Sequence, residues 1–442
     1  MCIRDSYLLS MWSKESGVTF VGVALAADFL FPVEEKRFPV RRFAVYAVAL
    51  GVWIALRAVA LQGAVADTVF IDNPTVVASA YDRILTAAAV QLDYLRLLVW
   101  PVAQSPDYSY AEREVVTNLA DPRVLGFGLV LAVALVAAAR LRKRAPIVAL
   151  CVAGYAVLFS VTSNFLFPIG TIEGERLAYA PSIFVLVLAA ACLRPALAAA
   201  VLVVVLGGLT VRQSRIWRDE PTFFREAAQA APKSAKARQN LGTQFEHEGD
   251  YLGAAREFEE VVRIAPRYVY AWIVLGHLRR REGDAAGAAK AWHEALELDP
   301  GFSATRADLA HAFIDLGQRA EAASQARELF GRDLLYPRLA ELQNRLASGA
   351  SPDELRAALA EIEAARAALA RGDAKGAIAI AQELAAGPTL PAAERAQALL
   401  LLADAWESLG KAPRAGTYRK AAQQTEGRPV QESGATPSPA RR

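Results

Sequence analysis

The chain has 442 residues, is 54% hydrophobic and has a mean hydropathy of +0.22, which makes it more apolar than an ordinary soluble protein. The net charge of +3 belongs to residues 1–212, because positive and negative side chains balance in the remainder. A protein that binds nucleic acid needs a basic stripe, and this composition excludes that class of partner.

The first ten residues fit neither a signal peptide nor the start of a helix. The opening run Met1-Cys2-Ile3-Arg4-Asp5-Ser6 resembles translated adapter sequence. We therefore expect residues 1–10 to be non-native and the natural protein to begin upstream. A natural short polar start is the alternative.

Residues 11–212 are predicted to form a polytopic bundle of transmembrane helices. Apolar stretches close to the ~20 residues that cross a bilayer fall at 16–31, 43–61, 124–140, 145–163, 177–193 and 196–211. The stretch 83–100 is ambiguous because Asp93 and Arg96 interrupt it. Ionisable residues in a spanning helix are costly unless the bundle buries them.

Two basic loops indicate the topology: Lys36, Arg37, Arg41 and Arg42 form one, and Arg140, Arg142, Lys143 and Arg144 form the other. The positive-inside rule places both on the cytoplasmic side. The six spans agree with this if 83–100 does not cross, so that 62–122 is an external re-entrant or juxtamembrane segment. Residues 164–176 and everything after Arg212 then also face the exterior. If 83–100 does cross, the two loops fall on opposite sides.

A 34-residue period follows the membrane half. It separates Pro232, Pro266 and Pro300, and the same step recurs at Leu241, Leu275 and Leu309. This period is typical of tetratricopeptide (TPR) repeats, in which pairs of helices stack because a single pair cannot bury its own apolar face. The sequence therefore predicts an all-α protein, a transmembrane helix bundle followed by a TPR α-solenoid with its repeats in 213–333.

Beyond the clear repeats, residues 334–426 are predicted to form degenerate TPR-like helical pairs, and 427–442 a disordered tail rich in Pro, Ser and Gly. TPR grooves usually bind extended peptides, and Gln239 and Asn240 occupy groove-facing positions of the first repeat. An acceptor protein in this groove is the expected partner. A plain structural spacer is the alternative.

Several polar motifs share the predicted external face, and each has a structural explanation when read alone. Lys14 and Glu15 suit an interfacial pair, Asp72-Asn73-Pro74 is turn chemistry, and Arg176 near Tyr179 suits a headgroup-level anchor. As a set they indicate a site for a phosphate-bearing lipid, because cations and a tyrosine hydroxyl bind phosphate while carboxylates handle an acceptor or a metal.

The order of these motifs resembles that of the transmembrane and TPR repeat-containing O-mannosyltransferases over roughly residues 10–330. The resemblance is carried by Ser13-Lys14-Glu15-Ser16-Gly17, Asp72-Asn73-Pro74, Asp107-Tyr108-Ser109, Ser163-Asn164, Glu175-Arg176, Tyr179-Ala180-Pro181-Ser182 and Trp217-Arg218-Asp219-Glu220. That family is similar to GT-C glycosyltransferases, so the bundle is expected to be the C-terminal part of a GT-C-like fold.

The resemblance implies a polyprenyl-phospho-sugar donor, with mannose as the sugar, and transfer to protein hydroxyls outside the cytoplasm. It implies Lys14, Arg176 and Tyr179 as ligands of the donor phosphate, and Asp107 and Glu175 as candidate catalytic residues. The principal catalytic acid of GT-C enzymes lies in their first external loop, which residues 1–15 do not match. We therefore expect that acid to lie upstream and this chain by itself to be inactive.

Two functions remain open from the sequence. One is a membrane glycosyltransferase whose repeats bind the acceptor, and the other is a non-catalytic membrane-anchored scaffold for an envelope complex. The four histidines suit no metal motif, so no metal ligand is assigned, although a divalent ion remains an alternative for the transfer chemistry. The Ala-rich composition favours a bacterial inner-membrane protein with its repeats in the periplasm.

Overall fold

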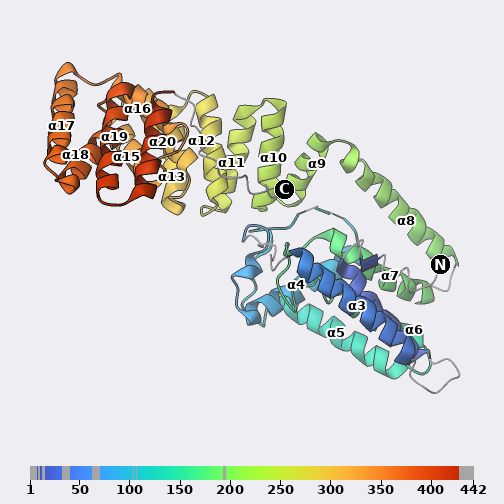
Figure 1. The fold of residues 1–442 in the computed structure, drawn as a ribbon. Helices are drawn as coiled ribbons and strands as arrows, with labels where there is room; N and C mark the ends of the chain where they lie inside the picture. Colours follow the sequence, from blue (N-terminus) through green and yellow to red (C-terminus); the bar gives the residue numbers. More distant parts are fainter. Residues whose placement is uncertain are drawn as a thin grey trace. The chain divides into compact units, whose positions relative to one another are not determined.

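The computed structural model describes residues 7, 10–11, 15–31, 40–61, 70–102, 104–105, 107–192 and 196–427. Within these ranges all regular structure is helical (Figure 1), apart from an isolated bridge between Tyr110 and Arg113. The predicted all-α class is therefore confirmed for the part of the chain that is described. Lys14, the first basic loop at 36–42 and the predicted tail from 428 onward fall outside the ranges whose side chains are described.

The chain forms two compact units, residues 1–266 and 267–442. The first unit contains the membrane helices and the helices α9 to α11, which form the first repeat and its approach. The second unit contains the remaining repeats. The boundary between the units thus lies after the first repeat and not at the end of the last apolar helix.

Four helices of the first unit are long and apolar enough to cross a membrane. They comprise Phe43–Leu61 within α3 (Val40–Leu61), α5 (Pro122–Leu141), α7 (Glu175–Cys192) and Leu197–Ser214 within α8 (Ala196–Ser214). Few of their side chains are buried by the protein itself, as expected for surfaces that contact lipid. These four match four of the six predicted spans.

The other two predicted spans are shorter apolar helices. The first combines the 3-10 helix η1 (Glu15–Thr19) with α2 (Phe20–Leu30), and the second is α6 (Pro146–Phe159), which packs against α2, α5 and α7. The stretch predicted at 145–163 ends early because polar Ser160, Thr162 and Ser163 begin a loop instead of a further helical turn.

The ambiguous stretch at 83–100 lies in α4 (Ala80–Val99), which is not among the four candidate spans. Ser79 begins this helix by accepting a hydrogen bond from the Asp82 amide at 3.1 Å, the usual N-cap arrangement. α4 buries one face, including Leu85, Ala89 and Tyr94, while Arg96 is exposed. α4 packs against α5 and α7 and carries one wall of the polar cluster described below.

The first repeat begins after η3 (Ile216–Arg218) and α9 (Glu220–Ala230), and consists of α10 (Ala235–Glu248) and α11 (Tyr251–Ile264). Gly249 ends α10 in the left-handed region, with φ of 82°, and Asp250 caps α11 through the Gly253 amide at 2.9 Å. Phe258 of α11 is fully buried against Gly242. This packing is what the spacing of small and aromatic residues requires.

The second unit contains four helix–turn–helix pairs and one single helix among its described residues. The pairs comprise α12 (Val269–Arg281) with α13 (Ala285–Leu298), α14 (Ser303–Asp315) with α15 (Arg319–Arg332), α17 (Pro352–Ala370) with α18 (Ala374–Ala386), and α19 (Ala392–Ser408) with α20 (Ala412–Thr425). The single helix α16 (Leu339–Ala347) lies between the second and third pairs and packs against α14 and α15. A continuous core of Ala, Leu and Phe joins α14 to α20.

Candidate functional site

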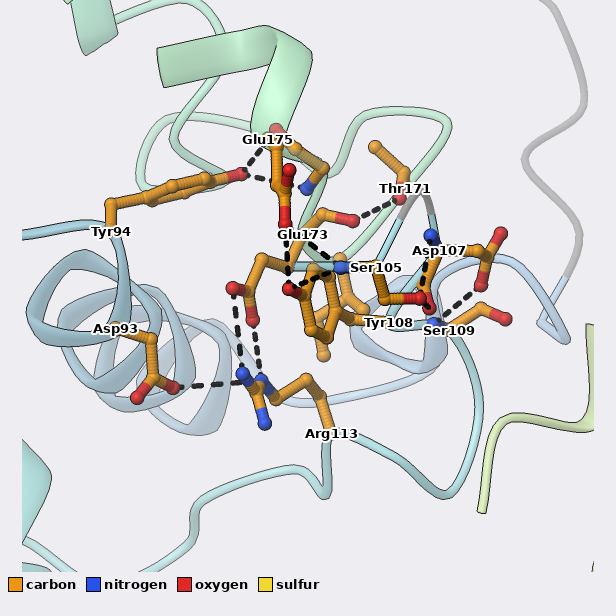
Figure 2. A network of polar contacts seen from close by, with 12 residues as sticks. Asp93, Tyr94, Ser105, Asp107, Tyr108, Ser109, Arg113, Thr171, Glu173 and Glu175 are labelled. Carbon is orange, nitrogen blue, oxygen red and sulfur yellow. Dashed lines mark hydrogen bonds and ion pairs between the residues drawn. The ribbon is translucent and has the colours of Figure 1, made fainter. Parts of the chain in front are cut away.

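A buried polar cluster lies at the ends of the membrane helices of the first unit (Figure 2). Two connections contribute most of it: the segment 100–121, between α4 and α5, and the loop 160–174, between α6 and α7. Both pack against α4, so side chains that are far apart in sequence meet at one place. Ionisable groups gathered in this way at a helix-bundle end are a reason to look for function.

The centre of the cluster is an ion pair between Arg113 and Glu173. The Arg113 Nε and Nη2 atoms donate to the two carboxylate oxygens of Glu173, the second at 3.5 Å, and Glu173 is completely buried. Asp93 of α4 lies on the other side of Arg113, with Nε and Oδ2 3.5 Å apart. Arg113 therefore joins two carboxylates that belong to a helix and a loop, and it satisfies the buried charge of Glu173.

The surroundings raise the pKa values of both Glu173 and Arg113. Burial raises the pKa of the Glu173 carboxyl to about 7, against the lowering effect of Arg113, and the nearby Asp93 and Glu175 add to the rise. Burial alone would lower the pKa of Arg113, but its contacts with Glu173 and Asp93 outweigh that effect and raise it. Arg113 thus stays cationic while Glu173 titrates close to neutral pH.

A second set of contacts holds Glu175 at the start of α7. Its Oε1 atom accepts from the Tyr108 hydroxyl at 2.8 Å and from the Ser105 amide at 2.9 Å. Burial and Glu175 raise the pKa of Tyr108, so the hydroxyl stays protonated and donates. The Arg113 guanidinium lies over the Tyr108 ring, 4.9 Å from its centroid, and links the Glu175 contacts to the Glu173 pair.

Asp107 lies beside this network and faces the first repeat. Its Oδ1 atom accepts from the Ser109 amide at 2.8 Å and from the Ser234 hydroxyl at 3.3 Å. Ser105 connects it to Glu175, because the Ser105 hydroxyl donates to the Asp107 carbonyl at 2.9 Å. The two candidate catalytic residues are therefore neighbours in one network without touching each other.

Two buried asparagines fix the loop 160–174. The Asn73 Nδ2 atom donates to the Asn164 Oδ1 atom at 2.9 Å and to the Ile169 carbonyl at 2.7 Å, while Asn73 Oδ1 accepts from the Thr75 amide at 3.1 Å. Asn164 has φ of 61° and donates to the Thr171 carbonyl at 3.1 Å. An Asn tolerates this left-handed conformation better than most residues. The Asn73 and Asn164 pair thereby sets where Glu173 and Glu175 lie.

The other residues predicted for the site lie apart from this network. Arg176 and Tyr179 are exposed on α7; at a spacing of three they share one face of the helix. Gln239 and Asn240 are half-buried on α10. Lys14 falls outside the described residues. Across the described part of the chain, no group of three His, Cys, Asp or Glu side chains is arranged to hold a metal ion.

Arg113 belongs to none of the predicted motifs, while Tyr108 lies in the motif Asp107-Tyr108-Ser109 and Glu173 in the predicted external stretch 164–176, both without a predicted role. One feature of the sequence indicates a cation such as Arg113: Asp93, in the ambiguous stretch at 83–100, requires a positively charged partner. The structure gives that partner as Arg113, whereas Arg96, in the same helix, is exposed. The pairing joins residues 20 positions apart, across the irregular segment that follows α4, and residue spacing alone does not reveal it.

Comparison with known proteins identifies a relative of this chain. A protein O-mannosyl-transferase from Caenorhabditis elegans is 26% identical over 244 residues, which cover 53% of this chain. The chain resembles an O-mannosyl-transferase. The resemblance drawn from the motifs is confirmed by this relative, of whose length the alignment spans 35%, or about a third. No model of a protein family matches the chain.

Several solved structures have some likeness to the chain, and one of them is described as a TPR protein. The MamA protein is 17% identical with a TM-score of 0.24, covering 46% of this chain and 98% of its own. YrrB, described as a TPR protein with an unusual peptide-binding site, is 11% identical with a TM-score of 0.26, covering 46% and 92%. The PilF protein of Pseudomonas aeruginosa is 17% identical with a TM-score of 0.25, covering 48% and 85%.

Proposed function

We propose that this protein is a membrane glycosyltransferase of GT-C type, which transfers a sugar, mannose by its resemblance, from a polyprenyl-phosphate donor to protein hydroxyls. The observation that carries the proposal is the sequence similarity to an O-mannosyl-transferase. Transfer takes place on the extracytoplasmic side, where the positive-inside rule puts the loops of the polar cluster. In a bacterial inner membrane that side is the periplasm.

The donor phosphate is bound by Arg176 and Tyr179, with Lys14 as a further cation. Arg176 and Tyr179 are exposed at the start of a helix that is apolar enough to span the membrane, which suits a ligand held at headgroup level. A guanidinium forms paired hydrogen bonds with phosphate. The lipid part of the donor then remains in the bilayer while its sugar faces the loops.

The carboxylates near Arg176 organise the reacting groups. Glu175 precedes Arg176 directly and is held by Tyr108 and Ser105, while Asp107 faces the first repeat. An acceptor hydroxyl needs a base to take its proton, and Asp107 and Glu175 are the candidates within this chain. Glu173 is completely buried and paired with Arg113, so its role is to hold the loops in place.

The repeats bind the protein acceptor, with Gln239 and Asn240 in the groove of the first repeat. A divalent metal ion is used by some enzymes to stabilise a departing phosphate. The described residues do not fit a metal ion, since they form no suitable group of ligands.

A second candidate function is a non-catalytic scaffold anchored in the membrane. One observation favours it: the carboxylates in the polar cluster each have an internal partner, namely Arg113 for Glu173, Tyr108 for Glu175 and the Ser109 amide for Asp107. Such pairing is also what a purely structural cluster shows. The two candidates differ in whether changing the exposed Arg176 alters transfer.

The test is a transfer assay in membranes that contain the protein of the longest reading frame in the source DNA. Arg176→Ala is expected to reduce transfer from a polyprenyl-phospho-mannose donor at least 100-fold, about 3 kcal/mol for a lost charged hydrogen bond to the donor. Arg142→Ala, an exposed cation of the predicted cytoplasmic loop, is the control and is expected to keep full transfer. Equal transfer by both variants removes Arg176 from the site, and no transfer by the parent protein favours the scaffold.

A further inference from the structure

The start of α10, in the first repeat, contacts the external segments of the membrane half. The Lys236 Nζ atom lies 2.7 Å from the Asp72 Oδ1 atom, and both side chains are about 30% exposed, at 31% and 29%. These residues are 164 positions apart. A half-buried ion pair over this separation ties the repeat to the segment that also carries Asn73.

Ser234, which is fully buried, makes a second connection. It is the N-cap of α10, and its hydroxyl accepts from the Ala237 amide at 3.1 Å and donates to Asp107 Oδ1 at 3.3 Å. The Ser109 hydroxyl lies 3.2 Å from the Ser234 hydroxyl oxygen. Because the single Ser234 proton goes to Asp107, Ser109 is the donor in this contact. One cap residue thus bonds to its own helix and to two residues of the loop.

Backbone groups add further contacts between residues 107–112 and the start of α10, an interface that we call the joint. The Ala235 amide donates to the Tyr110 carbonyl at 3.2 Å, and the Lys233 amide donates to Glu112 Oε2 at 3.0 Å. Amides at the start of a helix have no partner within the helix and must find one elsewhere. Here the loop supplies the partners, so residues 107–112 and the start of α10 satisfy each other's hydrogen bonds.

We propose that the first repeat is an integral part of the external site, and that Ser234 and Lys236 are positioning residues for the loop 107–113. This loop carries Tyr108 and Arg113, which contact Glu175 and Glu173. The first repeat therefore positions the residues of the polar cluster by holding this loop in place. The compact first unit, which ends at Pro266 and includes the first repeat, is the arrangement that this role requires.

The joint also fixes where an acceptor in the first repeat lies, a consequence that rests on the proposed function. Gln239 and Asn240 follow Lys236 by three and four residues, so they share its face of α10 about 5 Å further along the axis. Lys236 itself contacts Asp72. An extended peptide held at Gln239 and Asn240 is thus presented next to the loop that carries Asp107.

The loop's dependence on α10 is tested by hydrogen–deuterium exchange on the whole chain in detergent or nanodiscs. Lys236→Ala and Ser234→Ala are expected to speed amide exchange in residues 107–113 on the order of 5- to 10-fold, as loss of one or two bonds allows. Lys236→Arg is expected to restore protection. The control is Arg238→Ala, a cation on the same helix that pairs with Glu257 inside the repeat at 2.9 Å; it leaves this segment unchanged.

Unchanged exchange at 107–113 in both Lys236→Ala and Ser234→Ala overturns the proposal. An equal rise in Arg238→Ala also overturns it, because general loosening of the repeat would then explain the effect. Exchange needs no sugar donor and no transfer. A parent protein without transferase activity would contradict the proposed function. The exchange result would still show whether the start of α10 positions residues 107–113.

A cross-link tests whether the joint stays closed during transfer. With the native cysteines replaced, Ser109→Cys with Ser234→Cys is expected to form a disulfide, since the two hydroxyl oxygens lie 3.2 Å apart. Transfer by the oxidised variant is expected to equal or exceed transfer by the same variant when it is reduced, because the cross-link holds the repeat against the loop. Loss of transfer on oxidation and its return on reduction would show that the repeat must move away, and would contradict the positioning role.

Discussion

Arg113 connects four residues of the polar cluster, directly or through Tyr108. Its guanidinium binds Glu173, lies 3.5 Å from Asp93 and stacks on Tyr108, which in turn donates to Glu175. Removing one partner of a buried ion pair is strongly destabilising because the other charge remains in a poor solvent. The residue that organises this site is thus an arginine that no local motif marks.

The raised pKa of Glu173 predicts how stability depends on pH. Its folded pKa is about 7, above the ordinary value of 4.5, so the folded protein holds the proton more tightly than the unfolded chain. This contribution is fully present below about pH 4.5 and is lost as the pH rises to about 7. It amounts to roughly 3 kcal/mol.

Glu173→Gln is expected to flatten this part of the stability profile, because glutamine does not titrate. The measurement is thermal unfolding of the first unit in detergent between pH 5 and 8, for the parent and the variant side by side. A variant whose unfolding midpoint falls with pH as steeply as the parent's would contradict the assignment.

Asn73 is the residue whose loss should most disturb the loop 160–174. Asn73→Ala removes donors to Asn164 and Ile169 and leaves buried acceptors unpaired, at a cost of about 2 to 4 kcal/mol. Limited proteolysis between residues 160 and 174 is expected to become faster. Asn118→Ala, at an exposed position, is the matched control, and equal proteolysis of the two variants would refute the prediction.

At the scale of elements, the helix pairs depend on close packing between one small and one large residue. A Cβ atom at Gly276 would lie 2.3 Å from the Trp292 Nε1 atom, and that indole donates to the Ile273 carbonyl at 3.1 Å. Trp292 is completely buried. The ring therefore has no room to move, and the glycine is required by contact and not by backbone conformation.

Gly276→Ala is expected to destabilise the second unit by about 1 to 3 kcal/mol, the usual cost of overpacking. Gly416→Ala makes the same chemical change in α20, where no atom lies within 4 Å of the added Cβ. It is expected to be neutral or to stabilise by up to about 1 kcal/mol, because alanine favours the helix. Denaturant unfolding of both variants compares them, and similar midpoints would contradict the packing argument.

At the scale of the whole molecule, the 34-residue period was sufficient to predict the helical pairs. It was not sufficient to predict the polar cluster. Repeats are built from local contacts, so the spacing of Leu241, Gly249 and Ala254 contains the information needed. The Asn73–Asn164 and Arg113–Glu173 contacts join residues 91 and 60 positions apart. Such pairs arise from the packing of loops whose conformations no periodicity encodes.

The boundary between the two compact units also depends on contacts between residues that are distant in the sequence. The end of the last apolar stretch at 212 marks a change in composition, but the bonds of Ser234 and Lys236 cross it. We predict that residues 267–442 expressed alone fold into a helical, protease-resistant unit. A fragment from 213 is expected to have a first repeat that is cut rapidly near 230–250, since its loop partners are missing. Equal resistance of the first repeat in the fragment and in the whole chain would contradict this.

The left-handed glycine that ends α10 and the aspartate cap that follows it recur at other helix–turn–helix pairs of the chain. The run Gly-Asp-x-x-Gly begins at Gly249, at Gly283 and again at Gly372 in the degenerate region. Gly317, which keeps the 34-residue step, and Gly372 are 55 residues apart, 21 more than one period, and α16 lies in this interval. The pair of α17 and α18 therefore uses the same turn and cap as the clear repeats, displaced from the 34-residue step by the interval that contains α16.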